Sequence, residues 1–571
     1  MKKIDFGKAL DKARKNARTD GKKTAPKPVR KKTRKQPRKV KDGKPSHIAV
    51  DALAGTGKTF TLVVGVAALF ASATFGRSWK TVVKKLGFDP KPTAQQSGVW
   101  KALKSGPLPR TITYLAYNRT IVDDFGAEWK CLVDVLKKDN IFFNFRTCHS
   151  LGFGACCKAY GLKLENVNQF KTQDLLEREL GQDLRVYSEE VDGGSTIVSA
   201  VVKLVSQCKL NLVNLWEKDK DGKWEALANL ATHFEIDLET EDGFDLRDEV
   251  FRLVPVILDQ SRKETGTIDF DDQVWLPNVN NLPVAVCDLL LGDEAQDWNK
   301  AQQALLTKAG RRIVMVGDVN QAIYGFAGAD VESIPRMKTE LQASRKLETF
   351  PLTQTRRCSK AVVRDCQQLV PEFEAFPENP EGSVEAMSEE DMMKRVAEGD
   401  LILCRTTAPL VGYVTKLVKA GIKANINGRN FGEGLISLID RLKAKTLEDL
   451  VFGLDNWLAK ETAKVNARKH PSEDALIALT DKRDCVLAFT EGADSVKDVK
   501  DNINKLFSND REGVLASTIH RAKGMESTNV FLCHPELLPH PMAKTPWAIG
   551  QERNLDFVAR SRAKLNLFRV E

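Results

Sequence analysis

The sequence lacks the patterns of a secreted, disulfide-bonded or zinc-binding chain. Its 11 cysteines are scattered through 571 residues without a C-x-x-C pair, which predicts reduced thiols in a cytosol-like compartment. That compartment is the cytoplasm of a bacterial or virus-infected cell, or the nucleus if the host is eukaryotic. No basic-then-apolar leader opens the chain, so we do not expect secretion. Cys533, His534 and His540 lie close together, but their spacing fits no zinc site.

Long hydrophobic runs and short internal repeats are also missing. The most apolar stretch, residues 61–75, contains Thr, Gly and Ser, which favours a buried helix over a membrane span. With 42% hydrophobic residues the chain can nevertheless build sizeable cores. Its length predicts three or four domains.

Acidic residues are scarce at one end only. Residues 1–47 hold 19 Lys/Arg against 4 Asp/Glu, a net charge of +15, whereas residues 48–571 hold 68 against 73, a net charge of −5. The first segment has few apolar residues and several prolines, which is typical of disorder. It is either a solvated tail or an electrostatic arm for a polyanion, and we favour an arm that binds nucleic acid or a protein partner.

Short apolar segments alternate with helical patterns after this arm, which indicates parallel sheets covered on both faces. We expect strands within residues 47–53, 111–117, 283–294, 311–318, 399–406 and 529–534. Two charged, helix-patterned stretches interrupt the alternation, and we interpret each as an insertion in an α/β domain. The expected order is a disordered basic arm (1–46), a first domain (47–154 and 265–347) with an insertion (155–264), and a second domain (348–430 and 510–571) with a short insertion (431–509).

A loop of small residues follows the first expected strand. Residues 52–59, "ALAGTGKT", fit the phosphate-loop pattern GxxxxGK[ST], except that Ala52 replaces the first glycine. In such a loop the glycines let backbone N–H groups approach phosphate oxygens, the lysine reaches the β- and γ-phosphates, and the Thr hydroxyl can ligate Mg²⁺. A plain glycine-rich turn is the alternative, but the flanking strand and helix favour a nucleotide site. The expected contacts are Ala54, Gly55, Thr56, Gly57, Lys58, Thr59 and Phe60.

An acidic pair ends another expected strand, in "AVCDLLLGDEAQD". Asp293 can hold Mg²⁺, and Glu294 can accept a proton from an attacking water. A solvated acidic loop is the weaker interpretation, because an apolar strand leads directly into the pair. Together the two motifs predict hydrolysis of a nucleoside triphosphate with Mg²⁺.

Further sequence motifs around these two indicate what the hydrolysis is used for. "GDEAQD", "VMVGDVNQAIYGFAGAD", "STIHRAKGMESTNVFL" and "ERNLDFVARSRAKLNLF" resemble, in order, the motifs of UvrD/Rep-like superfamily 1 helicases. The resemblance covers most of residues 47–571 and implies two RecA-like domains with ATP between them. It also implies that Gln321 senses the γ-phosphate and that Arg357 and Arg562 reach it from the second domain, in agreement with the charge that the transition state spreads over the γ-oxygens. Glu526 lies where the family contacts nucleotide or supports coupling.

The same resemblance places contacts to a single strand of DNA. Aromatic side chains among small hydrogen-bond donors suit binding that ignores sequence, since every base has a π-face. Several have another interpretation: Tyr324 and Phe326 could pack in the core, and His149 could be a buried hydrogen-bonding residue. The implied contacts are Tyr117, Asn118, Arg119, Thr147, His149, Phe326, Thr518 and His520.

Three positions depart from the family pattern. The adenine-contacting glutamine normally precedes the phosphate loop, but here the only earlier glutamine is Gln36, and a similar motif, "PTAQQSGVWKAL", follows at 92–103. Arg356 replaces the usual adenine-stacking aromatic residue, for which a guanidinium plane can substitute. Ala327 stands where many relatives carry Arg.

These observations predict an ATP-dependent DNA helicase that moves along single strands, with 3′→5′ polarity implied by the resemblance, in repair, replication or recombination. We expect a monomer that acts at junctions of single and double strands and does not contact membranes. A translocase that strips proteins from DNA and a nucleic-acid-binding scaffold with weak ATPase are the alternatives. A helicase–nuclease is disfavoured, because only nine residues follow Arg562.

Overall fold

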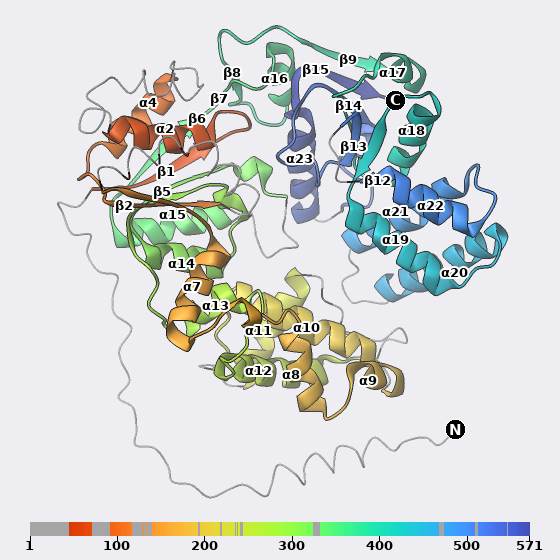
Figure 1. Ribbon diagram of the computed structural model, residues 1–571, viewed down its shortest axis with the longest axis horizontal. Coiled ribbons are helices and arrows are strands. Elements are labelled where there is room, and N and C mark those ends of the chain that lie inside the picture. Colours follow the sequence, from red (N-terminus) through yellow and green to blue (C-terminus); the bar gives the residue numbers. More distant parts are fainter. Residues whose placement is uncertain are drawn as a thin grey trace, which may run out of the picture. The chain divides into compact units, whose positions relative to one another are not determined.

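The computed structural model describes most of the chain beyond the basic arm (Figure 1). Within these residues no helix has the length and apolar character needed to cross a bilayer. The described part of the apolar stretch after the phosphate loop, residues 61–70, lies in the buried helix α2 (Lys58–Phe70). The predicted arm lies outside the described residues except at its last two positions. The described ranges are 45–70, 92–116, 140–191, 194–216, 220–234, 244–323, 332–466, 473–508, 512–544 and 546–571, with single positions between some of them.

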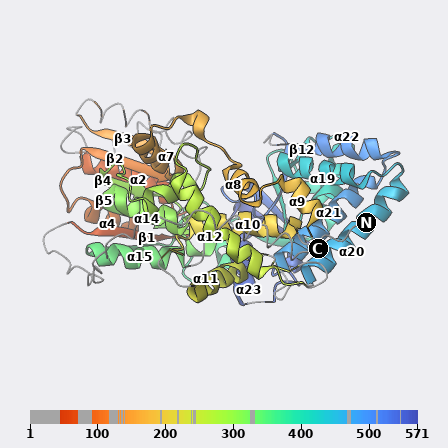
Figure 2. The ribbon, with the colours of Figure 1, turned by 90° about the horizontal axis from the view of Figure 1, so that it is seen from below.

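The first sheet has six strands in the order β3-β2-β4-β5-β1-β6, and every neighbouring pair is parallel. In Figure 2 the labels β3, β2, β4, β5 and β1 follow one another in this order. The four segments predicted as strands in this part of the chain are all strands. The strands are β1 (His47–Ala52), β2 (Thr111–Ala116), β3 (Phe142–Thr147), β4 (Cys287–Gly292), β5 (Gly310–Gly317) and β6 (Leu347–Leu352).

Both faces of this sheet are buried. Along β5, Val314 and Val316 pack with α2 and α4 (Ala94–Leu103), while Ile313 and Met315 pack on the other face with α14 (Lys300–Ala309) and α15 (Ser333–Ser344). Figure 1 shows the two helix pairs on opposite sides of the strands. A strand that is buried on both faces must be apolar at every position, which explains the unbroken apolar run in the sequence.

A helical unit separates β3 from β4. It has its own hydrophobic core and buries charges next to that core. Lys171 Nζ lies 2.7 Å from Asp272 Oδ2, and Lys209 Nζ lies 2.9 Å from Asp272 Oδ1 and 2.5 Å from Asp269 Oδ2. Its helices are α7 (Cys148–Tyr160), α8 (Lys171–Leu180), α9 (Leu184–Glu190), α10 (Gly194–Leu210), α11 (Lys220–His233), α12 (Arg247–Lys263) and α13 (Asp272–Val279).

The second sheet has seven strands in the order β12-β11-β13-β10-β14-β15-β9, all parallel. The two segments predicted as strands in this half are β10 and β14. Beside them, a two-stranded ladder joins β7 (Gln354–Thr355) to β8 (Glu374–Ala375). The sheet consists of β9 (Ser383–Met387), β10 (Leu401–Cys404), β11 (Ala424–Asn427), β12 (Phe507–Ser508), β13 (Val514–Thr518), β14 (Ser527–Cys533) and β15 (Ala563–Val570).

Helices cover the second sheet as well. The expected insertion after β11 is helical, and its buried residues join one core with α18 and the strands. The opposite face packs against α16 and α23. The helices of this half are α16 (Lys360–Cys366), α17 (Glu389–Arg395), α18 (Ala408–Lys419), α19 (Arg429–Leu442), α20 (Leu447–Asn466), α21 (Glu473–Thr490), α22 (Val496–Leu506) and α23 (Pro546–Arg560).

Two sheet edges extend past the domain boundaries expected from sequence. The first domain was expected to end at residue 347, but β6 pairs with β1 from Leu347 to Leu352. The second insertion was expected to run to residue 509, but Phe507 and Ser508 pair with β11. In both places backbone pairing with a strand far away in the sequence sets the limit, and no local pattern reports that pairing.

The buried charges of the helical unit give a stability prediction. Asp272→Asn leaves Lys171 and Lys209 with too little negative charge in a site where their side chains are 1% exposed, so the local free energy of opening should fall by about 3–5 kcal/mol. Hydrogen exchange of the amides in α10 and α12 measures that loss. Glu390→Gln, which breaks an exposed pair with Lys394, is the control and should leave the exchange unchanged. Equal exchange in both variants would contradict the prediction.

Candidate functional site

The predicted phosphate loop is a tight turn between β1 and α2. Gly55 and Gly57 have φ values of +66° and +77°, a conformation that glycine adopts without strain. A Cβ on Gly55 would lie 2.5 Å from Arg357 Cβ, so a larger residue is excluded there. Lys58 begins α2, whose N-terminal N–H groups favour an anion.

Two residues of the loop do not face the site as expected. Ala54 is fully buried, and the Thr56 hydroxyl donates a hydrogen bond to the Leu53 carbonyl oxygen at 2.8 Å. Neither lines the pocket described below. Their side chains serve the turn, and only their backbone groups remain available to a ligand.

The acidic pair lies beside the loop, because β1 and β4 are parallel strands whose carboxyl ends meet at one edge of the sheet. The Asp293 carboxylate accepts hydrogen bonds from the hydroxyls of Thr59 and Tyr114, both at 2.7 Å. Lys58 Nζ donates to Glu294 Oε2 at 3.2 Å. Glu294 has a φ of +53°, which is strained for a residue with a side chain and is most often found at functional sites.

Burial and neighbouring charges set the protonation of these groups. Burial and the Glu294 carboxylate raise the pKa of Asp293. Burial would raise the pKa of Glu294, but the ammonium groups of Lys58 and Lys523 outweigh it and lower that pKa. Burial would lower the pKa of Lys58, but Glu294, Asp318 and Asp293 raise it. Glu294 is therefore an ionised carboxylate at neutral pH, held beside a cation.

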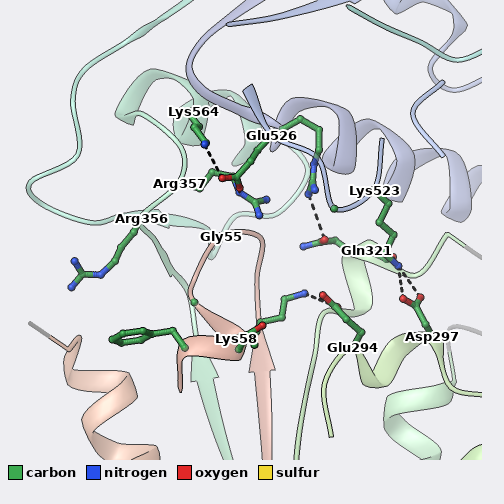
Figure 3. Close-up of a pocket in the computed structure, with 15 residues that line it drawn as sticks. Gly55, Lys58, Glu294, Asp297, Gln321, Arg356, Arg357, Lys523, Glu526 and Lys564 are labelled. Atoms are coloured by element: carbon green, nitrogen blue, oxygen red, sulfur yellow. Dashed lines mark hydrogen bonds and ion pairs between the residues drawn. The ribbon is translucent and has the colours of Figure 1, made fainter. Parts of the chain in front are cut away.

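A cavity of about 510 Å³ opens above these residues (Figure 3). Segments beside the second sheet supply Arg357, Glu526 and Arg562, and the first sheet supplies Gln321. Arg357 Nε lies 2.5 Å from Glu526 Oε2, and an Arg562 N–H donates to Gln321 Oε1 at 3.5 Å. The lining residues are Gly55, Gly57, Lys58, Thr59, Phe60, Glu294, Asp297, Gln321, Arg356, Arg357, Lys523, Gly524, Glu526, Arg562 and Lys564.

Asp297 and Lys523 were not predicted as site residues. Lys523 Nζ donates to both Asp297 carboxylate oxygens and to the Gln321 carbonyl oxygen, each at 2.8 Å. Burial raises the pKa of Asp297 to about 6, although Lys523 opposes the shift. Both residues lie inside motifs on which the family resemblance rests: Asp297 in "GDEAQD" and Lys523 in "HRAKGMES". An acidic and a basic residue within those motifs could therefore have been predicted as an ion pair of the site.

The glutamine-containing motif that follows the loop in sequence lies beside it in space. Residues 94–103 form α4, and Gln96 Nε2 donates to the Thr56 carbonyl oxygen at 3.4 Å and to Thr61 Oγ1 at 3.2 Å. A Cβ on Gly57 would lie 3.1 Å from that nitrogen. The other candidate, Gln36, lies outside the described residues.

The predicted contacts to single-stranded DNA fall into two described groups, and four of them lie outside the described residues. Tyr117, Asn118, Arg119 and Phe326 lie outside the described residues. Thr147 and His149 lie where β3 ends and α7 begins, and Thr147 caps that helix by accepting a hydrogen bond from Ser150 N. Thr518 and His520 lie at the end of β13 in the second sheet, where the Thr518 residue is only 8% exposed. Burial lowers the pKa of His149 to about 4 and, with Arg405 and Arg521, that of His520 to about 3.

An exposed aromatic residue lies beside His149. The Phe270 side chain is 58% exposed, and its ring centroid lies 4.1 Å from that of His149 at 30°. Phe270 sits between Asp269 and Asp272, which the buried lysines hold, so the ring is presented from a fixed backbone. Phe270 was not predicted as a functional residue, because a Phe among three aspartates, "DFDD", belongs to no periodic pattern or motif.

Comparisons with known proteins agree with the motifs. Residues 132–342 match the UvrD/REP helicase N-terminal domain, and residues 470–570 match the UvrD-like helicase C-terminal domain. Over 85 residues the chain is 34% identical to DNA helicase II of Haemophilus influenzae, a match that spans 14% of this chain and 11% of that protein. Arterivirus nonstructural protein 10, a helicase, aligns over 50% of this chain and 40% of its own with 14% identity and a TM-score of 0.24, which is too low to bear on the fold.

The two family matches together take in more than half of the chain and occur in the same order as the two sheets. The predicted phosphate loop precedes the first matched range and lines the pocket from the carboxyl end of β1 in the same sheet. The chain therefore belongs to the UvrD/Rep-like helicase family.

Proposed function

We propose that this protein is an ATP-driven DNA helicase that moves 3′→5′ along single-stranded DNA and separates duplexes. The observation that carries the proposal is the pocket itself, in which Lys58 and Glu294 beside one sheet face Arg357 and Arg562 beside the other. Both domains would place cations around the same polyphosphate. Hydrolysis could therefore change the contacts between the two domains.

In this proposal Lys58 binds the β- and γ-phosphates, and Arg357 and Arg562 stabilise the charge that develops on the γ-oxygens. Gln321 links the γ-phosphate to Arg562, with which it already shares a hydrogen bond. Glu526 orients Arg357. Burial and the neighbouring Arg357 lower the pKa of Arg562, but a guanidinium remains charged at neutral pH.

The residues beside the loop fit Mg²⁺. The Thr59 hydroxyl and the Asp293 carboxylate are hard oxygen ligands, and their oxygens lie 2.7 Å apart. The ion would neutralise charge on the β- and γ-phosphates. Glu294 accepts the proton of the attacking water, and Gln296, which donates to Glu294 Oε2 at 2.6 Å, fixes the carboxylate.

The single-stranded DNA would cross the carboxyl-terminal ends of the β-strands β3 and β13. We assign base stacking to the His149–Phe270 pair, because a ring with 58% exposure offers a face to any base. The side chains of Thr147, Thr518 and His520 would contact the backbone or bases at the same ends. The basic arm would add electrostatic affinity for nucleic acid or bind a protein partner.

Steady-state ATP hydrolysis with and without single-stranded DNA, followed by unwinding of duplexes with 3′ or 5′ tails, tests the proposal. We expect strong stimulation by DNA and unwinding from 3′ tails. Displacement of streptavidin from biotinylated strands without unwinding would favour the protein-stripping translocase instead. Hydrolysis that ignores DNA would reject both.

Glu294→Gln should separate binding from chemistry. The amide keeps the size of the side chain but cannot take a proton, so ATP should still bind while DNA-stimulated hydrolysis falls by ~10²–10⁴-fold. Asp288→Asn, near the start of the strand β4 that leads to Glu294, is the matched control and should hydrolyse ATP at the parent rate. Loss of ATP binding in Glu294→Gln would make the residue structural.

Phe270→Ala should weaken binding of single-stranded DNA by ~1–3 kcal/mol, the cost of one lost base stack. Phe244→Ala, at another exposed phenylalanine of the same helical unit, is the control and should bind normally. Because His149 titrates at about pH 4, it is neutral throughout pH 6–8, and the effect of Phe270→Ala should be the same at both ends of that range. Unchanged affinity in Phe270→Ala, or an effect that appears only at pH 6, would contradict the assignment.

A further inference from the structure

Arg356 is fixed in place by local contacts. Its N–H donates to the Gly55 carbonyl oxygen at 3.0 Å, and Phe376 N–H donates to the Thr355 carbonyl oxygen at 2.9 Å. The second bond continues the β7–β8 ladder, in which Thr355 pairs with Ala375, so Arg356 and Phe376 are cross-strand neighbours. The position of Arg356 therefore depends on the phosphate loop and on a short ladder.

The ladder stacks the two side chains. The Arg356 guanidinium carbon lies 3.8 Å from the centre of the Phe376 ring, a cation–π contact that holds the guanidinium plane in one orientation. Arg356 lines the same pocket as Phe60. Figure 3 shows Arg356 on the opposite side of Lys58 from Glu294, which places it away from the phosphate chemistry, where a nucleobase belongs.

The amide groups of the nearby Gln95 and Gln96 already form hydrogen bonds within the protein. Gln96 is 1% exposed; its nitrogen donates to Thr56 and Thr61, and its oxygen accepts from Thr93 N. Gln95 exchanges two hydrogen bonds with Thr353, from its nitrogen to Oγ1 at 2.8 Å and from Thr353 N to its oxygen at 2.9 Å. Neither glutamine lines the pocket in the described part of the chain.

Adenine and guanine differ only at their edges, so a site tells them apart by hydrogen bonds to those edges. Such bonds give large discrimination, because a wrong base leaves buried polar groups unpaired. A planar cation and a carbon ring instead contact the face, which all four bases share.

We propose that this pocket binds the nucleobase by stacking against Arg356 and Phe60, with no side chain among the described residues reading its edge, and accepts purine and pyrimidine nucleoside triphosphates alike. The inference rests on the proposed nucleotide site. Phe376 is a positioning residue that orients the guanidinium, and Gln95 and Gln96 support the loop and the sheet.

Equilibrium displacement of a fluorescent ADP by ATP, GTP, CTP and UTP tests this directly, without requiring hydrolysis. We expect ATP and GTP to agree within about threefold, and the pyrimidine nucleotides to bind within about tenfold of them, because a smaller ring stacks less. A preference for ATP over GTP of a hundredfold or more would overturn the inference while leaving the proposed helicase function intact. Failure of every nucleotide and of the fluorescent ADP to bind would reject the nucleotide site itself.

Two variants sharpen the test. Phe376→Leu keeps an apolar side chain but removes the ring, so all four nucleotides should bind more weakly by similar factors, while competition by inorganic tripolyphosphate stays unchanged because it has no base. Gln95→Ala is the matched control for edge recognition and should leave the ATP-to-GTP affinity ratio unaltered. A change in that ratio in Gln95→Ala, or equal weakening of tripolyphosphate in Phe376→Leu, would overturn the inference.

Discussion

Charge neutrality in a buried pocket is the constraint on which the rest of this structure depends. Lys58 pairs with Glu294, Lys523 with Asp297, and Arg357 with Glu526. An unpaired charge in such a place costs several kcal/mol, and each of these three cations has a carboxylate within reach. Parallel strands supply that proximity in the first sheet, because their carboxyl ends deliver residues distant in sequence to one edge.

The same constraint explains how a polyphosphate could change the protein. Phosphate oxygens would compete with Glu294 and Glu526 for Lys58 and Arg357, and each released carboxylate must find new compensation. Two of the three pairs involve residues beside the second sheet, and Lys523 also holds the backbone of Gln321. In the proposed function, binding and hydrolysis therefore alter contacts between the sheets, and strand-binding residues at the ends of β3 and β13 move with them.

Patterns within short stretches of sequence predicted the features that those same stretches determine. The apolar strands, the phosphate loop and the acidic pair each occupy a few consecutive residues, and all six predicted strands are present. Pairing between distant segments left no such signal: β6 joins the first sheet through β1, and Asp297 and Lys523 are 226 positions apart. Gln96 contacts the loop although it follows the loop in the sequence, because α4 packs against α2.

The measurement that tests the account most directly is a double-mutant cycle on Asp297 and Lys523. Asp297→Asn and Lys523→Met each leave one member of the pair without its partner in a side-chain environment less than 10% exposed. If the pair couples the two sheets, DNA-stimulated hydrolysis should fall steeply in each single variant. The double variant should then be no worse than the more damaged single one, which gives a coupling energy of about 1–3 kcal/mol. Additive losses would contradict the claim that buried charge pairing links the sheets.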